Sequence, residues 1–224
     1  MWPRWVSHWY RINMVKKVAV RGVFEINAYF YIDETTNHGF LIDPGAEADK
    51  LLDIIAREGL VIEKILITHG HFDHIGAAEQ ISKVLGIPIY VHREGKKYVT
   101  NTLWNLSQVC RENITLKDVM YLEEQDIIAL EANSNFTLKV LYVPGHTLDS
   151  VVYYSENGNV AFVGDTIFAG SIGRSDFYGG NTVQLLTGIV QKIFSLPDHT
   201  ILYSGHSEPT TVLVEKGVQR QLLR

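Results

Sequence analysis

The segment THGHFDH, residues 68–74, holds three histidines and one aspartate within six consecutive positions. His69 and His71 are two residues apart, so in an extended backbone their imidazoles point to the same side. Asp73 and His74 come where a helical pattern begins, and we expect them to face a neighbouring position. Imidazole and carboxylate ligands without cysteine suit zinc, and also iron or manganese. The segment therefore predicts ligands for two adjacent metal ions.

Three more candidate ligands follow strand-like runs elsewhere in the chain. His146 follows LKVLYVPG, Asp165 follows NVAFVG, and His206 follows TILYSG. If these strands share a sheet direction, their ends gather at one sheet edge, where loops can be shaped without disturbing the core. We expect His146 to complete the first metal position and His206 the second, with Asp165 bridging both. Two metal ions about 3.5–4 Å apart would hold a bridging water and lower its pKa toward about 7.

The remaining histidines and the single cysteine lack such a pattern. We interpret four histidines as surface or structural residues: His8, His38, His92 and His199. Cys110 is alone, so no intrachain disulfide can form, and it is better interpreted as a small apolar residue than as a nucleophile.

The elements that must position these residues alternate along the chain. Runs of β-branched and aromatic residues bounded by turn signals predict strands or hairpins at residues 18–23, 28–32, 39–45, 64–68, 87–92, 136–146, 150–165 and 200–206. Apolar residues at helical spacing predict helices at residues 46–59, 75–85, 95–112, 182–196 and 210–223. Because the helices fall between groups of strands, sheets covered by helices on the outside are the natural packing.

Composition limits the class of protein. The chain has 224 residues, of which 46% are hydrophobic and 20% charged, with a net charge of −5 and no run of Lys and Arg. These values favour a globular protein and argue against nucleic-acid binding. No apolar run is long enough to span a bilayer, and the single cysteine fits a reducing environment, so we predict a cytoplasmic protein that does not bind membranes. We expect one domain over residues 15–224, preceded by a Trp-rich leader at residues 1–14 that has no catalytic role. Three interpretations of the leader are left open: an artefact of start-site choice before Met14, a disordered segment, or an aromatic tail that packs on another surface.

THGHFDH, PGHT, VGD and SGH, in this order, resemble the metallo-β-lactamase superfamily over about residues 15–214. The resemblance implies an α/β fold, a four-layer αββα sandwich. It implies a first metal site at His69, His71 and His146, a second at Asp73, His74 and His206, and a bridging ligand at Asp165. It also implies that Asp43, in LIDPG, supports the metal-binding loops from behind, although an Asp before Pro is also a common turn residue.

Within that superfamily, GDTIFAGSIGRSDFYGG and GHSEPTTV resemble the compact bacterial members of the glyoxalase II-like group. This implies hydrolysis of S-lactoylglutathione or a related acyl-thiol to a hydroxy acid and a thiol by a metal-bridging hydroxide. Two divalent ions are implied, zinc before iron or manganese, with Asp73 binding one and orienting the nucleophile. Arg174 lies where the group places its substrate-anchoring basic residue, and the alternative role is a salt bridge to Asp176.

Two features depart from that group. Full-length glyoxalase II has a C-terminal helical domain that binds glutathione, whereas only about eighteen residues follow His206 here, so the use of glutathione is left open. In PGHTLDS, residues 144–150, many relatives have Pro-Gly after the threonine.

Other functions use the same scaffold. The main alternative is a persulfide dioxygenase, which uses one iron and has a stretch close to GRSD. A non-hydrolytic metal or redox scaffold is favoured less, because such relatives normally carry a flavin domain and replace one loop histidine. A lactonase or β-lactamase is also favoured less, because of the GRSD loop. The acyl group, the thiol, the resident metal and the oligomeric state are not determined by the sequence.

Overall fold

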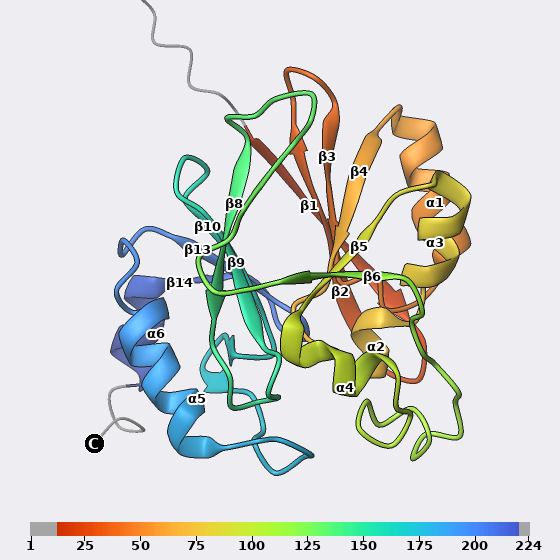
Figure 1. Cartoon of the computed structure of the whole chain (residues 1–224). Helices are drawn as coiled ribbons and strands as arrows, with labels where there is room; N and C mark the ends of the chain where they lie inside the picture. The colour runs from red at the N-terminus through yellow and green to blue at the C-terminus, as the bar shows by residue number, and fades with distance from the viewer. Residues whose placement is uncertain (1–12, 220–224) are drawn as a thin grey trace, which may run out of the picture.

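The computed structural model describes residues 13–219 and consists of two six-stranded sheets packed face to face between outer helices (Figure 1). The first sheet has the order β1-β2-β3-β4-β5-β6 and the second the order β14-β13-β10-β9-β8-β7. Helices α1 and α3 cover the outer face of the first sheet, and α5 and α6 cover the second. The predicted four-layer αββα sandwich is therefore confirmed.

The strands and helices have the following bounds. The first sheet contains β1 (Asn13–Arg21), β2 (Glu25–Asp33), β3 (His38–Ile42), β4 (Val61–Leu66), β5 (Ile89–His92) and β6 (Val119–Leu122). The second contains β7 (Ile127–Ala129), β8 (Thr137–Tyr142), β9 (Val151–Ser155), β10 (Val160–Gly164), β13 (Ile201–Ser204) and β14 (Thr210–Thr211), and β11 (Ile167–Phe168) pairs with β12 (Ser171–Ile172). The helices are α1 (Ala48–Glu58), α2 (Phe72–Ile75), α3 (Ala78–Leu85), α4 (Lys96–Val99), α5 (Thr182–Gly188) and α6 (Val212–Val218), with a 3-10 turn at Arg93–Gly95 and a π-helical turn at Ile189–Ile193.

The core follows from side-chain alternation along buried strands. In β2, Phe30 and Ile32 pack with the residues that face α1 and α3, while Tyr29 and Tyr31 face the second sheet. This is the two-residue period of a strand that is buried on both faces. In the second sheet, Val152 and Ala161 pack against Leu185 of α5 in a third apolar cluster. Three apolar layers therefore hold the sandwich together.

The parallel strands set the direction of the sheet ends. β3, β4, β5 and β6 run parallel in the first sheet, as β10 and β13 do in the second. The segment after β4 and the residues after β10 and β13 consequently emerge at one rim of the sandwich, and the segment after β8 joins them there.

Several predicted boundaries differ from the structure. β1 starts at Asn13, so the last two residues of the expected leader belong to a strand, and residues 1–12 lie outside the described part of the chain. The helix expected at 75–85 is two helices, α2 and α3, because the chain turns at Gly76 and Ala77. The helix expected at 210–223 starts only at Val212, because Thr210 and Thr211 form β14. α6 ends at Val218, and residues 220–223 of the expected helix lie outside the described part of the chain.

The helix predicted at residues 95–112 is wrong beyond α4. Residues 100–118 form turns and irregular structure. The Asn101 carboxamide oxygen accepts hydrogen bonds from two amides further along the chain, and Leu106 has a left-handed backbone with φ of 69°. Asparagine side chains compete with helical hydrogen bonds in this way. The resulting loop, residues 100–118, supplies Leu106 to the cavity described below.

No helix among residues 13–219 combines the length and the apolar character that crossing a bilayer requires.

Candidate metal centre

The first group of candidate ligands is a triad of buried imidazoles. The His69 Nε2 and His71 Nδ1 atoms lie 3.1 Å apart, and His146 Nε2 lies 3.2 Å and 3.1 Å from them. All three side chains are buried. Three nitrogens that converge at this spacing, from the segment after β4 and the segment after β8, present their lone pairs to one point.

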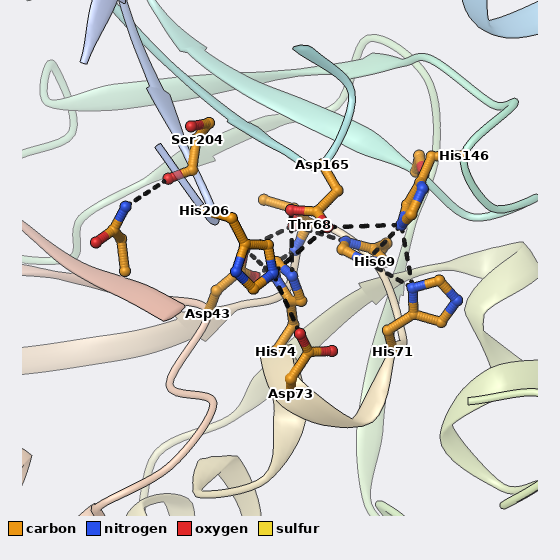
Figure 2. A network of polar contacts seen from close by, with 12 residues as sticks. Asp43, Thr68, His69, His71, Asp73, His74, His146, Asp165, Ser204 and His206 are labelled. Atoms are coloured by element: carbon orange, nitrogen blue, oxygen red, sulfur yellow. Dashed lines mark hydrogen bonds and ion pairs between the residues drawn. The ribbon is translucent and has the colours of Figure 1, made fainter. Parts of the chain in front are cut away.

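The second group lies beside the first and is linked to it by Asp165 (Figure 2). His206 Nε2 is 3.2 Å from Asp73 Oδ2. Asp165 faces His74 Nε2 at 3.4 Å and His206 Nε2 at 3.5 Å, and its Oδ2 is 3.8 Å from His146 Nε2. Asp165 thus lies between the two groups, so the structure brings all seven predicted ligands to one place.

The imidazoles of the first group are in the protonation state that binds a metal ion. Burial lowers the pKa of His69 well below its usual value and lowers that of His71 to about 3, with further lowering from neighbouring imidazoles. Both imidazoles are therefore neutral at pH 7, which is the form that binds metals.

Around Asp165, interactions between charges outweigh the effect of burial on the pKa values. Burial raises the pKa of Asp165, but His74, His146 and His206 outweigh it and hold the pKa well below its usual value. Burial likewise lowers the pKa of His74, but Asp165 and Asp43 outweigh it and raise the pKa. The two carboxylates therefore favour a positive charge at His74, either a proton on the imidazole or a metal ion that displaces that proton.

Unsatisfied polar atoms test whether the residues fit metal ions. Among the described residues, buried His74 Nε2 and Asp165 Oδ1 have no hydrogen-bond partner, although they lie 3.4 Å apart. Leaving a buried polar atom unpaired costs about 1–3 kcal/mol. A cation between a nitrogen and a carboxylate oxygen would satisfy both atoms, so the donor set fits a pair of divalent ions.

Hydrogen bonds behind the ligands fix the orientation of the imidazole rings. Asp43 accepts from the Thr68 amide at 2.8 Å and the Thr68 hydroxyl at 2.6 Å, and it also accepts from His74 Nδ1 at 2.9 Å. His146 Nδ1 donates to the Arg174 carbonyl at 2.6 Å, and His206 Nδ1 donates to the Glu25 carbonyl at 2.9 Å. Each of these rings therefore turns Nε2 toward the centre.

Arg174 makes the salt bridge that was the alternative to substrate anchoring. Its Nε and Nη2 atoms donate to the two Asp176 oxygens at 2.9 Å and 2.7 Å, and the guanidinium lies 4.4 Å from the centroid of the Phe177 ring. Both charged side chains are about two-thirds exposed, 66% and 65%. Arg174 lines the cavity above the centre, and two of its five N–H donors bind Asp176.

Asp149 was not among the predicted site residues. Its Oδ2 accepts from the amide of Gly70, between His69 and His71, at 2.8 Å, and its side chain is buried. Burial raises its pKa to about 7. The only sequence signal for this contact is the departure in PGHTLDS, where an aspartate stands at the position of the usual glycine.

A cavity of about 490 Å³ opens above the centre. Its floor contains His71, Asp73, His146, Asp165 and His206, and its walls are largely aromatic. These five candidate ligands are therefore accessible to a small molecule.

Comparisons with known proteins agree with this geometry. The family described as Metallo-beta-lactamase superfamily matches residues 21–206. The chain is 39% identical to the Probable metallo-hydrolase YqgX of Bacillus subtilis (strain 168), over 87% of this chain and 91% of that protein. It is 34% identical to the Hydroxyacylglutathione hydrolase GloC of Haemophilus influenzae (strain ATCC 51907 / DSM 11121 / KW20 / Rd), over 86% of this chain and 91% of that protein.

Solved structures show the same fold. BLEG-1 B3 metallo-beta-lactamase superposes with a TM-score of 0.87 at 34% identity, covering 94% of this chain and 100% of that one. TTHA1623 in a di-iron-bound form superposes with a TM-score of 0.80 at 32% identity, covering 91% and 98%. The chain therefore belongs to the metallo-beta-lactamase superfamily, whose fold binds divalent metal ions.

Proposed function

We propose that the protein is a metal-dependent hydrolase of acyl-thioesters, similar to glyoxalase II, that converts an acyl-thiol and water into a carboxylic acid, such as a hydroxy acid, and a thiol. The observation that carries this proposal is the pairing of two ligand groups through Asp165, with all ligand atoms within each group no more than 4.8 Å apart. The similarity to a protein named hydroxyacylglutathione hydrolase supports the choice of a thioester.

Each side chain has a role in the proposal. His69, His71 and His146 would hold one divalent ion, and Asp73, His74 and His206 would hold the other, with Asp165 shared. When bound, the ions supply an activated water and polarise the thioester carbonyl. Nitrogen and carboxylate donors suit zinc, iron and manganese, and zinc is proposed first.

Asp73 is proposed to orient the attacking water. Its carboxylate is at the floor of the cavity, 3.2 Å from His206 Nε2. Burial raises the pKa of Asp73, but the hydrogen bond with His206 and the charge of His74 hold it below its usual value. An ionised carboxylate at this position accepts a hydrogen bond from water and directs an oxygen lone pair toward a bound carbonyl.

Water is a sufficient nucleophile at this site. The described residues that line the cavity include no serine or cysteine, and Cys110 is half-buried outside that lining. A serine or cysteine acyl-enzyme route therefore has no side chain to carry it among these lining residues, whereas hydrolysis by an oriented water needs none.

Metal counting together with turnover tests the proposal. Purified protein should contain about two metal ions per chain, and release of thiol from S-lactoylglutathione or from a simpler thioester should be detectable with a thiol reagent. His71→Ala should lose bound metal and at least about a hundredfold in kcat/KM, because a ligand of the triad is removed. His199→Ala is the matched control, since His199 is exposed and its Nε2 contacts only the Asn159 carboxamide.

The same preparations separate the alternative functions. If the protein contains one iron per chain and consumes oxygen when glutathione persulfide is added, it is a persulfide dioxygenase and the hydrolase proposal is wrong. Metal-replete protein without turnover of any thioester would contradict the hydrolase itself.

A further inference from the structure

The cavity above the centre has an apolar wall. Five large apolar side chains line it: Phe24, Phe72, Leu106, Phe168 and Phe177. The Phe177 ring lies 5.6 Å from that of His71, and the Phe168 ring lies 6.4 Å from that of His206, measured between centroids. The Phe24 side chain is 50% exposed, so it is available to a molecule that enters the cavity. A substrate that reaches the ligands must therefore pass between aromatic rings.

A second cavity, of about 220 Å³, adjoins the first. Both cavities are lined by Phe24, Phe72 and Asp73, and the Phe24 and Phe72 rings pack with centroids 5.9 Å apart. The rest of the second lining consists mostly of small or apolar residues, among them Gly22, Val23, Gly45, Ala46, Ala77 and Ile114. A thioester has two arms, one on each side of its carbonyl. The adjoining cavities can accommodate both arms of such a molecule.

The charge of the two linings is unfavourable to an anionic substrate arm. Among the described lining residues, Arg174 is the only Lys or Arg, and it makes a two-hydrogen-bond salt bridge with Asp176. Carboxylates are more numerous, with Glu25 in the first lining and Glu112 in the second, where Glu47 is paired with Lys50. Glutathione carries two carboxylates at pH 7, and a carboxylate that leaves water without a cationic partner is strongly disfavoured.

We propose that the natural thioester has an apolar arm without carboxylates, rather than glutathione. This inference rests on the proposed thioesterase function and narrows its substrate class. In the reaction, water adds to the carbonyl carbon and the carbon–sulfur bond breaks. The oxygen of water stays with the acid, and one of its protons goes to the departing thiolate. The apolar arm packs against the phenylalanine rings, where each buried methylene contributes about 0.8 kcal/mol.

Three thioesters test the inference on metal-replete wild-type protein. S-lactoylglutathione and S-lactoyl-N-acetylcysteamine share the acyl group and differ in the charge of the thiol. S-hexanoyl-N-acetylcysteamine has an apolar acyl arm and the same neutral thiol. We expect kcat/KM for the hexanoyl ester to exceed that for S-lactoylglutathione at least tenfold, with the neutral lactoyl ester also above S-lactoylglutathione.

Two variants link the preference to the cavity walls. Phe24→Ser should lower kcat/KM for the hexanoyl ester at least fivefold and change the neutral lactoyl ester little, with metal content unchanged. Val183→Ser is the matched control, because Val183 is 73% exposed on α5 and lines neither cavity. Glu112→Lys should raise kcat/KM for S-lactoylglutathione about threefold or more without raising it for the neutral lactoyl ester.

The outcomes separate the inference from the function on which it rests. A preference for S-lactoylglutathione over both neutral esters, or a loss on Arg174→Gln confined to S-lactoylglutathione, would overturn the inference and leave the thioesterase proposal standing. Failure of metal-replete protein to hydrolyse any of the three would overturn both.

Discussion

Asp43 lies outside the set of candidate ligands but is hydrogen-bonded to it. Its carboxylate accepts hydrogen bonds from Thr68, at the start of the histidine segment, and from His74 Nδ1. One side chain therefore fixes both the backbone before His69 and the ring of His74. Such partners orient metal ligands and raise their basicity. The resemblance and the structure agree on this supporting position, and its effect on metal binding is a prediction.

Asp43→Asn should weaken metal binding about 10–100-fold. The amide nitrogen of asparagine is a donor, so it cannot replace both carboxylate oxygens as acceptors for Thr68 and His74. Metal affinity measured by competition with a coloured chelator checks this expectation. Asp53→Asn, at an exposed position of α1, is the control. Equal affinities in Asp43→Asn and wild type would show that the contact does not support the ligands.

Asp149 predicts a pH effect at the same scale. Burial raises its pKa to about 7, so its stabilising contribution is complete below its usual pKa of 3.8 and is lost as the pH rises through about 7. Asp149→Asn keeps an acceptor for the Gly70 amide and does not ionise. The difference in the free energy of unfolding, variant minus wild type, should therefore increase between pH 4 and 7 and stay constant above pH 7. Denaturant titrations across this range measure the difference. A decrease in this difference as the pH rises would contradict the burial of the Asp149 carboxyl group.

At the scale of elements, the loops that follow the strands pack without spare space. A Cβ atom on Gly205, just after β13, would lie 2.5 Å from Asp165 Oδ1 and 2.7 Å from His74 Cε1. A Cβ atom on Gly45, after β3, would lie 1.6 Å from the Asp73 carbonyl oxygen. Glycine is required at both positions because neighbouring loops touch the backbone there. The ligand positions therefore depend on contacts between loops as well as on the strands.

Gly205→Ala should displace Asp165 or His74 and lower metal occupancy and kcat/KM at least about tenfold. Gly217→Ala is the control, because a Cβ there meets nothing within 4 Å and Gly217 lies in α6. Alanine in a helix should stabilise the control variant by about 0.5–1 kcal/mol. Thermal unfolding and metal analysis of both variants distinguish a local effect on the centre from a general loss of folding. Normal occupancy in Gly205→Ala would refute the proposed packing constraint.

The elements also show what local sequence patterns can predict. α1 was predictable because Leu51, Ile54 and Ile55 recur at helical spacing and Gly59 takes the left-handed conformation that ends a helix. The helix expected beyond α4 failed because side chains such as that of Asn101 bond to the local backbone, which hydrophobic spacing does not report. The short pair β11 and β12 was missed because two-residue strands have no periodicity.

The candidate site was predictable to a similar degree. The seven ligand candidates carry a local signal, since each follows a strand or begins a helix, and the structure brings them together. Leu106 and Phe24 carry none, because they reach the cavity from irregular segments whose course depends on tertiary contacts. For Arg174 the sequence left two roles open, substrate anchoring and a salt bridge to Asp176. Asp149 was recognisable only as an aspartate where many relatives have glycine.

At the scale of the whole molecule, the two sheets are joined at the rim and also away from it. Glu63, in β4 of the first sheet, accepts hydrogen bonds from the Glu131 and Ala132 amides that follow β7 in the second. It also lies 2.8 Å from His38 Nδ1, and its side chain is 8% exposed. The contact ties the sheets at a position separate from the candidate metal centre.

Glu63 predicts a second pH effect, of opposite sign to that of Asp149. Burial raises its pKa, but the hydrogen bonds from Glu131, Ala132 and His38 outweigh burial and lower it. The stabilising contribution is therefore present above its usual pKa of 4.5 and is lost as the pH falls through the lowered value. Glu63→Gln should reduce the free energy of unfolding by about 1–3 kcal/mol at pH 7, with the deficit shrinking below pH 4.

Denaturant titrations at several pH values measure this deficit. Glu34→Gln, at an exposed position, is the control and should match wild type throughout. If the loss in free energy of unfolding were the same at every pH, the charge of Glu63 would not contribute to the contact between the sheets.

The division of the ligands between two sheets has a consequence for biosynthesis. Four candidate ligands lie in the segment His69–His74, whereas His146, Asp165 and His206 come progressively later in the chain. A nascent polypeptide leaves the ribosome N-terminus first. The early segment therefore emerges with neither ligand group complete, and each metal position lacks a donor until the second sheet forms. Stable metal uptake should accordingly follow the synthesis and folding of the second sheet.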